Sequence, residues 1–326
     1  MLTAQSSPST EIPSEAYRLC VKVAKLYYED DLTQSEIAGQ LGYSRVKVNR
    51  TLKRARELGI VRISVEVPED QNFDLEHALL ERYGLRDAVV TPSLEDEEAQ
   101  YLALSAGATS WLNEHLGPGL RIGLGLGRTI SHLPLTFQPD KKGDYTFTEV
   151  VGAASDHSRG LEAYNITSRM AEIANSKAEF FYAPTYVSDP ELKEKLLQEP
   201  SIAKALERAR SCDMVLQSVG PADDTATLYV HGYLSKAELN SIMEANAVGD
   251  ALGRFFNAEG QHVPTLCDDR IIGPTLDDLR SLPWSVAIAG GSAKVPVIDA
   301  ALKGQIFNVL VTDEQTARAL LNGKLA

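Results

Sequence analysis

The chain contains few cysteines and no long apolar run, and these absences exclude several classes of protein. Its 326 residues include three cysteines, Cys20, Cys212 and Cys267, which lie far apart and form no CxxC pair. We therefore expect reduced, structural thiols, and neither a disulfide framework nor a cysteine-based metal site. No apolar stretch is long enough to span a bilayer and the first residues are polar, so we expect no membrane segment, no secretory signal and a cytoplasmic location.

Metal ions, cofactors and nucleotides are not indicated either. The six histidines are scattered along the chain without metal-ligand spacing. A nucleotide phosphate loop ends in Gly-Lys-Ser or Gly-Lys-Thr, and the sequence contains neither tripeptide. We accordingly expect no metal, no cofactor and no nucleotide-dependent kinase activity.

Residues 33–63, TQSEIAGQLGYSRVKVNRTLKRARELGIVRI, have the pattern of a helix-turn-helix. Thr33 followed by Glu36 predicts a capping box, Gly42 suits a left-handed helix end, and Ser44 is placed to cap the next helix. A supporting amphipathic helix is expected over residues 15–29. Alternation of apolar and polar residues over 61–67 predicts a short strand that would form a wing.

The second helix of this motif is basic outside one apolar stripe. Val48, Leu52 and Ala55 share a face, and no acidic residue occurs over 45–56. A charged face can simply be solvated, but the helix-turn-helix spacing favours insertion into the major groove of double-stranded operator DNA. The expected DNA contacts are Thr33, Gln34, Ser44, Arg45, Lys47, Asn49, Arg50 and Lys53.

Charge is distributed unevenly between this head and the rest of the chain. The whole chain has a net charge of −13, yet residues 1–67 hold ten Lys or Arg against eight Asp or Glu. The remainder holds 22 basic and 37 acidic residues. An acidic body is repelled by phosphate, so we expect DNA contact to be confined to the head.

Beyond residue 67 the pattern predicts an α/β body. A connector is expected near residues 68–72, followed by a short helix over 75–83. Strands alternating with helices predict a Rossmann-like, mostly parallel sheet covered on both faces, so the chain divides into a helix-turn-helix domain over 14–67 and a body over 68–326. The expected strands are 88–91, 120–124, 146–151, 179–182, 214–219, 285–289 and 306–311, and the expected helices 97–116, 163–174, 201–210, 235–247 and 295–303.

Loops that follow these strands are the candidate binding sites, because ligands of parallel sheets bind where the strands end. Glycine lets the backbone approach an oxyanion, and Arg128 and Lys294 would add charge beside a helix start. Each loop could also be a tight turn without a ligand, and the GxGxG spacing does not match a dinucleotide fingerprint. The candidates are Gly123, Gly125, Gly127, Arg128 and Thr129, then Pro184, then Asp250 after a supposed turn at Gly249, and finally Gly291 and Lys294.

From residue 17 onward the chain resembles the SorC/DeoR family of bacterial sugar-responsive transcription regulators. In the head the resemblance rests on LTQSEIAGQLGYSRVKVNRTLKRARELGIVRISV. In the body it rests on RIGLGLGRTI, GDALGRFFNAEG and AIAGGSAKVPVIDAALKGQIFNVLVTDEQTARALL. It differs from the family at Asn49, where a serine is usual, and at 151–154, where the usual turn is richer in glycine.

The resemblance implies regulation of carbohydrate catabolism genes by a sugar or phosphosugar effector. It further implies a homo-oligomer, dimer or tetramer, and a body similar to sugar-phosphate isomerases and glucosamine-phosphate deaminases. Carried over position by position, the implied effector contacts are Gly125, Gly127, Arg128, Thr129, Asp250, Gly291 and Lys294.

The alternative is a phosphosugar isomerase or deaminase. Such enzymes place an acid-base histidine after a central strand, and residues 218–225 contain none. We therefore expect binding without turnover and assign no catalytic residue. Whether the effector is phosphorylated, and whether the protein represses or activates, stay open at this point.

Overall fold

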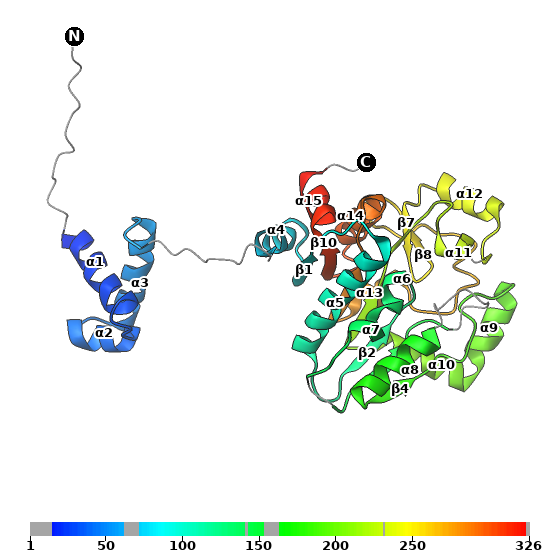
Figure 1. The fold of residues 1–326 in the computed structure, drawn as a ribbon, viewed down its shortest axis with the longest axis horizontal. Helices are drawn as coiled ribbons and strands as arrows, with labels where there is room; N and C mark the ends of the chain where they lie inside the picture. Colours follow the sequence, from blue (N-terminus) through cyan, green and yellow to red (C-terminus); the bar gives the residue numbers. More distant parts are fainter. Residues whose placement is uncertain (1–14, 62–71, 141–142, 153–162, 231, 324–326) are drawn as a thin grey trace, which may run out of the picture. The chain divides into compact units, whose positions relative to one another are not determined.

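A computed structural model describes residues 15–61, 72–140, 143–152, 163–230 and 232–323 (Figure 1). The chain forms two compact units, Met1–Pro68 and Glu69–Ala326. Residues 62–67 of the expected wing strand, and residues 153–162, fall outside the described residues. Among the described residues, no helix is both long and apolar enough to cross a membrane.

The head is a bundle of three helices, α1 (Glu15–Tyr28), α2 (Gln34–Leu41) and α3 (Arg45–Glu57). Thr33 and Glu36 form the predicted capping box, with the Glu36 side chain accepting from the Thr33 N–H at 2.8 Å. Gly42 ends α2 in the left-handed conformation, and Ser44 caps α3. The small core is made by Val23, Ile37, Ala38, Val48 and Leu52.

The body is built on a seven-stranded sheet in the order β1-β10-β9-β5-β2-β3-β4, and every neighbouring pair is parallel. Its strands are β1 (Asp87–Thr91), β2 (Arg121–Leu124), β3 (Thr146–Glu149), β4 (Lys177–Glu179), β5 (Met214–Gln217), β9 (Trp284–Ile288) and β10 (Val309–Asp313).

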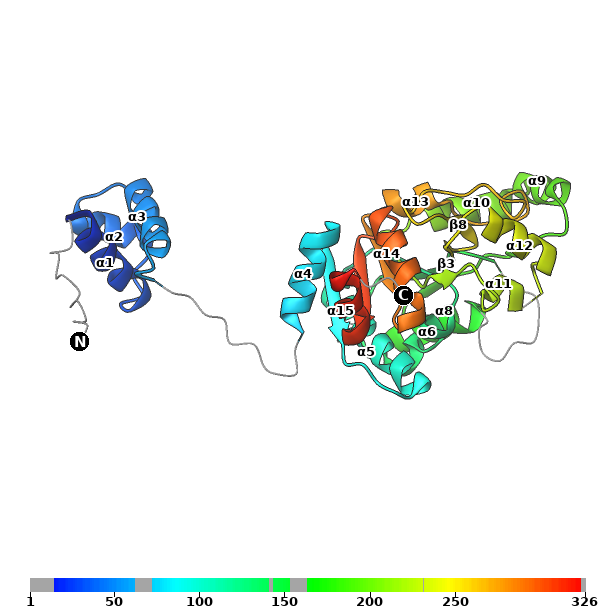
Figure 2. The ribbon, with the colours of Figure 1, turned by 90° about the horizontal axis from the view of Figure 1, so that it is seen from above.

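Helices cover both faces of the sheet, as predicted (Figure 2). One apolar cluster lies on the side of α5 and α8, and the other on the side of α10, α14 and α15. The body helices are α4 (Phe73–Tyr83), α5 (Glu97–His115), α6 (Arg128–Ser131), α7 (Leu133–Thr136), α8 (Ala163–Ala174), α9 (Pro190–Gln198), α10 (Pro200–Arg210), α11 (Thr227–Val230), α12 (Lys236–Glu244), α13 (Leu276–Ser281), α14 (Val295–Lys303) and α15 (Glu314–Asn322).

The chain order of the strands creates a switch point between β2 and β5. From β2 the chain continues outward through β3 to β4, and from β5 it continues in the opposite direction to β9 and β10. Loops on either side of such a point leave a crevice at the carboxyl ends of the strands. Here the Gly125 loop, after β2, and the segment that follows Gln217, the last residue of β5, flank that point.

A second, three-stranded antiparallel sheet was not predicted. It consists of β6 (Gly220–Pro221), β7 (Gly249–Ala251) and β8 (Arg254–Phe256). Strands of two or three residues are too short to show an alternating pattern, which explains the omission. The prediction of a glycine turn at Gly249 is wrong, because Gly249 lies in β7 and a Cβ there would come within 1.9 Å of the Val297 side chain.

Several boundaries also differ from the expectation. The expected strand over 179–182 ends at Glu179, because the Phe181 N–H leaves the sheet and donates to the Glu149 carboxylate at 2.7 Å. The strand expected over 306–311 begins at Val309 instead. The apolar residues Ile306 and Phe307 are nevertheless fully buried, and burial alone does not distinguish a strand from a packed loop.

Candidate functional site

The second helix of the head, α3, exposes the predicted basic surface. Arg45, Lys47, Asn49, Arg50 and Lys53 are all exposed, whereas Val48, Leu52 and Ala55 are buried against the bundle. The two helix caps have local roles. The Ser44 hydroxyl accepts from the Lys47 N–H at 3.2 Å, and the Thr33 hydroxyl donates to Glu36 at 2.7 Å.

Gln34 and Asn49 are joined across the turn. The Asn49 side-chain amide donates to the Gln34 side-chain oxygen at 3.4 Å, which links the first turn of α2 to the exposed face of α3. This contact orients the Asn49 amide, whose oxygen and nitrogen match the edge of adenine in the major groove. The sequence identified both residues but gave no indication that they meet.

In the body, glycine-rich loops from β2 and β9 approach the segment after β5. The Gly125 N–H donates to the Leu216 carbonyl at 2.9 Å, and a Cβ at Gly127 would lie 3.2 Å from the Ser218 Cβ. Gly127 has a φ of 141° and Gly291 a φ of 99°, values that residues with a side chain rarely adopt. Both loops therefore depend on glycine for their course.

Lys294 and Asp250 lie close enough at this edge of the sheet for each charge to affect the pKa of the other. The Lys294 ammonium donates to the Ser218 hydroxyl at 3.3 Å. Burial, together with the nearby charge of Arg128, lowers the pKa of Lys294 to about 8, and the carboxylates of Asp250 and Glu97 oppose the shift. Burial raises the pKa of Asp250 to about 6, offset by the Gly253 N–H at 2.9 Å and by Lys294. A half-buried cation and carboxyl of this kind suit recognition of a polar ligand.

The Gly291 loop is anchored by the neighbouring strand. The Gly291 N–H donates to the Asp313 carboxylate at 2.9 Å and to the Thr316 hydroxyl at 2.8 Å. Burial would raise the pKa of Asp313, but hydrogen bonds from Thr316, from the Ser93 hydroxyl and from the Gly291 N–H hold it below its ordinary value. Since Asp313 also caps α15, the loop and the start of that helix form one hydrogen-bonded unit.

Arg128 and Thr129 contact residues of α5 and are less directly placed for ligand binding than the sequence suggested. Arg128 is exposed and pairs with Glu97 of α5, with its Nη1 2.7 Å from the carboxylate. Thr129 is buried, and its carbonyl accepts from the Ser105 hydroxyl at 2.9 Å. Arg128 lies close enough to affect the pKa of Lys294, so its charge contributes to the same site.

Two other predicted residues lie apart from this group. Gly123 is inside β2, not in the loop, and a Cβ there would collide with Val150 and Val215. Sheet packing thus explains the glycine at this position, and the expected ligand contact at Gly123 stays a prediction. Pro184 is exposed after β4, where the adjoining Ala183 carbonyl would lie 1.8 Å from a Cβ at Gly152. Pro184 therefore lies beside Gly152, which follows β3.

The sequence did not identify Gln217, Ser218 and Glu149. Gln217 is 5% exposed, and its amide oxygen has no hydrogen-bond donor among the described residues. That oxygen would lie 1.6 Å from a Cβ at Gly125, so the glycine is what admits it. Burial raises the pKa of Glu149, at the end of β3, to about 7. The signal in the sequence that could have identified Gln217 and Glu149 is a polar residue at the end of an apolar strand.

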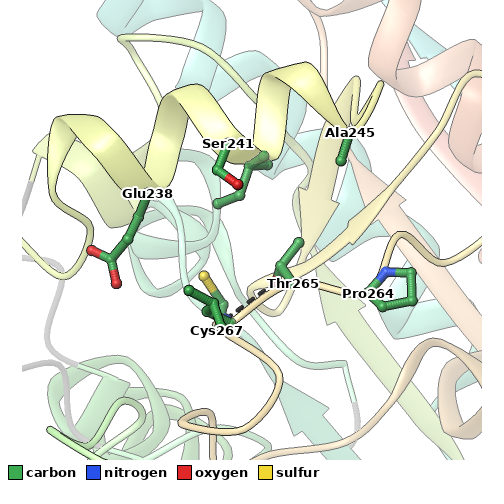
Figure 3. Close-up of a pocket in the computed structure, with 8 residues that line it drawn as sticks. Glu238, Ser241, Ala245, Pro264, Thr265 and Cys267 are labelled. Carbon is green, nitrogen blue, oxygen red and sulfur yellow. Dashed lines mark hydrogen bonds between the residues drawn. The ribbon is translucent and has the colours of Figure 1, made fainter.

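A separate hollow lies between α12 and the segment 264–267 (Figure 3). Its volume is about 290 Å³, and none of the predicted effector residues lines it. Its single carboxylate, Glu238, is already paired with Arg270 and with the Ser235 cap. This hollow therefore lacks the convergent polar groups found around Lys294. Among the described residues, no group of three potential metal ligands occurs anywhere.

Known proteins match both units. A family model described as "Putative sugar-binding domain" matches residues 68–322. The chain is 33% identical over 311 residues to the deoxyribonucleoside regulator of Bacillus subtilis (strain 168), covering 94% of this chain and 98% of that protein. It is 31% identical over 314 residues to the sorbitol operon regulator of Klebsiella pneumoniae, covering 94% and 99% respectively.

A solved structure also matches almost the whole chain. The crystal structure of the full-length sorbitol operon regulator SorC from Klebsiella pneumoniae matches with a TM-score of 0.73 at 30% identity, over 94% of this chain and 100% of that chain. The predicted fold class is thereby confirmed. The relatives named here are transcriptional regulators, which confirms the prediction that the chain is not an enzyme.

Proposed function

This chain belongs to the SorC/DeoR-type family of sugar-binding transcriptional regulators, and from that premise we propose that it controls carbohydrate catabolism genes in response to a hydroxylated effector. The effector binds at the carboxyl edge of the parallel sheet, and the head binds operator DNA. The observation that carries this proposal is the convergence of Lys294, Asp250 and two glycine loops at the switch point between β2 and β5.

The chemistry of the site favours a sugar or polyol. Asp250 accepts hydrogen bonds from hydroxyl groups when ionised, and the unpartnered oxygen of Gln217 requires a donor. Lys294 and the loop N–H groups suit a phosphate or a further hydroxyl. The names of the relatives, which refer to deoxyribonucleosides and sorbitol, indicate two effector classes to test: deoxyribose derivatives and sugar alcohols, each free or phosphorylated.

Hydrogen bonds within the body connect the loops of this site to its first described helix, α4. Helices α14 and α15 both begin at the Gly291 loop or at its anchor Asp313. Both reach α4, the first helix of the body (Figure 2). An effector that binds one arrangement of this loop more tightly shifts the position of α4. In a homo-oligomer, such a shift changes how well several heads fit operator half-sites.

Binding is tested directly by isothermal titration calorimetry of the full-length protein. The panel consists of D-glucitol, D-glucitol 6-phosphate, 2-deoxy-D-ribose and 2-deoxy-D-ribose 5-phosphate. We expect one member to bind, and Lys294→Met to weaken its binding by at least tenfold, since an ion pair or charged hydrogen bond is lost. Lys195→Met, at an exposed lysine of α9, is the matched control and should leave binding unchanged. Equal affinity of Lys294→Met and wild type would contradict the site.

A further inference from the structure

We propose that Val46 reads the 5-methyl group of a thymine in the major groove. Val46 is 70% exposed at the second position of α3, although valine prefers to be buried. The residues on either side of it in sequence, Arg45 and Lys47, are exposed and cationic. The inference depends on the proposal that the head binds operator DNA.

The helical period places Val46 on the face that points away from the bundle. Asn49, Arg50 and Lys53 follow it at i+3, i+4 and i+7, so the four residues share one exposed surface. The buried stripe of Val48, Leu52 and Ala55 lies on the opposite side. Val46 is therefore the apolar member of an otherwise polar and cationic reading surface.

The chemistry of that surface selects one type of base. A duplex presents an apolar group in the major groove only at the C5-methyl of thymine, or of a methylated cytosine. Asn49, oriented by its hydrogen bond with Gln34, is suited to adenine, while Arg50 and Lys53 can meet guanine or phosphate. A valine between such residues specifies an A·T pair whose thymine faces the helix, because contact removes both apolar surfaces from water.

The test removes the methyl group from the DNA and the side chain from the protein. An operator half-site is selected from a random duplex pool by the full-length protein, and each thymine is replaced in turn by 2′-deoxyuridine. For wild type, one such replacement should weaken binding about three- to fivefold, the effect of one buried methyl group. Val46→Ala should bind the two DNAs equally, and its circular dichroism should match wild type because the residue is exposed.

Leu58→Ala is the matched control, since Leu58 is also exposed, at 43%, but follows the end of α3. It should keep the full uracil effect. The proposal is overturned if no thymine replacement affects wild type, or if Val46→Ala retains the same loss. If the wild-type protein enriches no sequence from the pool, the DNA-binding proposal fails, and the assignment of Val46 fails with it.

Discussion

The Tyr83 hydroxyl of α4 donates a hydrogen bond of 2.8 Å to the Asp299 carboxylate of α14. Asp299 is 3% exposed and is also paired with Lys303 at 2.6 Å. Burial, together with this hydrogen bond, raises the pKa of Tyr83 to about 12. Because α14 begins directly after Lys294, the pair connects the helix nearest the proposed effector site to the first helix of the body.

Replacing Tyr83 by phenylalanine should destabilise the body. The buried Asp299 loses one donor, so we expect the free energy of unfolding to fall by about 1–2 kcal/mol, measured by urea denaturation. The control is Tyr182→Phe, at a tyrosine that is 78% exposed, and it should change stability by less than about 0.5 kcal/mol. Equal stability of the two variants would show that the Tyr83 hydrogen bond contributes nothing.

Glu149→Gln should change how stability depends on pH. Burial raises the pKa of Glu149 to about 7, above its value in the unfolded chain. The protonated carboxyl therefore stabilises the fold fully below about pH 4.5, and this contribution is lost as the pH rises through about 7. At pH 8 the variant should be more stable than wild type by about 3 kcal/mol.

Thermal denaturation of wild type and Glu149→Gln across pH 4 to 8 measures this difference. Asp250 titrates in an overlapping range, so the difference between the two proteins is the relevant quantity. A constant difference across the whole range would contradict the assignment of a raised pKa to Glu149.

Effector affinity should be greatest between about pH 6 and pH 8. Above this range Lys294, with a pKa of about 8, loses its charge, and below it Asp250, with a pKa of about 6, becomes protonated. Calorimetry at several pH values should show both declines. Lys294→Met should remove the decline at high pH, and Asp250→Asn the decline at low pH. Unchanged pH profiles in both variants would exclude these groups from binding.

Gln217→Met should raise the stability of the ligand-free protein but lower its affinity for the effector. Methionine fills a similar volume and removes the buried oxygen that has no donor among the described residues. We expect the ligand-free protein to become more stable by about 1 kcal/mol and the effector to bind less tightly. A loss of stability would instead show that the Gln217 oxygen is satisfied in the ligand-free fold.

Arg50→Ala should weaken operator binding and reduce its dependence on salt. A lost phosphate contact lowers the slope of log affinity against log salt by about one unit, whereas a lost guanine contact would leave the slope nearly unchanged. Fluorescence anisotropy at several salt concentrations distinguishes the two. The control Arg18→Ala removes an exposed arginine from α1 of the same head. If both variants lose affinity equally, α3 is not the reading helix.

Features that depend on neighbours in sequence could be predicted, and those that depend on distant packing could not. The capping box joins Thr33 to Glu36, three positions later, so its chemistry is visible in the sequence. The parallel sheet followed from the alternation of strand and helix patterns. By contrast, Gly249 is a glycine because the distant Val297 leaves no room for a side chain, and it was mistaken for a turn.

The candidate site shows the same division. Lys294 and the Gly291 loop were identified because glycines follow an apolar run, a local signal. Gln217 was missed because its unpartnered oxygen results from packing against Gly125, which is far away in the sequence. The ion pair between Arg128 and Glu97 was not predicted either, because the two residues lie on different helices and are 31 positions apart in the sequence.

The most direct measurement of the central claim is the operator affinity of the full-length protein with and without the effector identified by calorimetry. Fluorescence anisotropy should show a change of at least fivefold in wild type, in either direction, because coupling between two sites is commonly of this size. In Lys294→Met the same change in operator affinity should require at least tenfold more effector. Operator affinity that does not respond to a saturating effector in wild type would contradict the account.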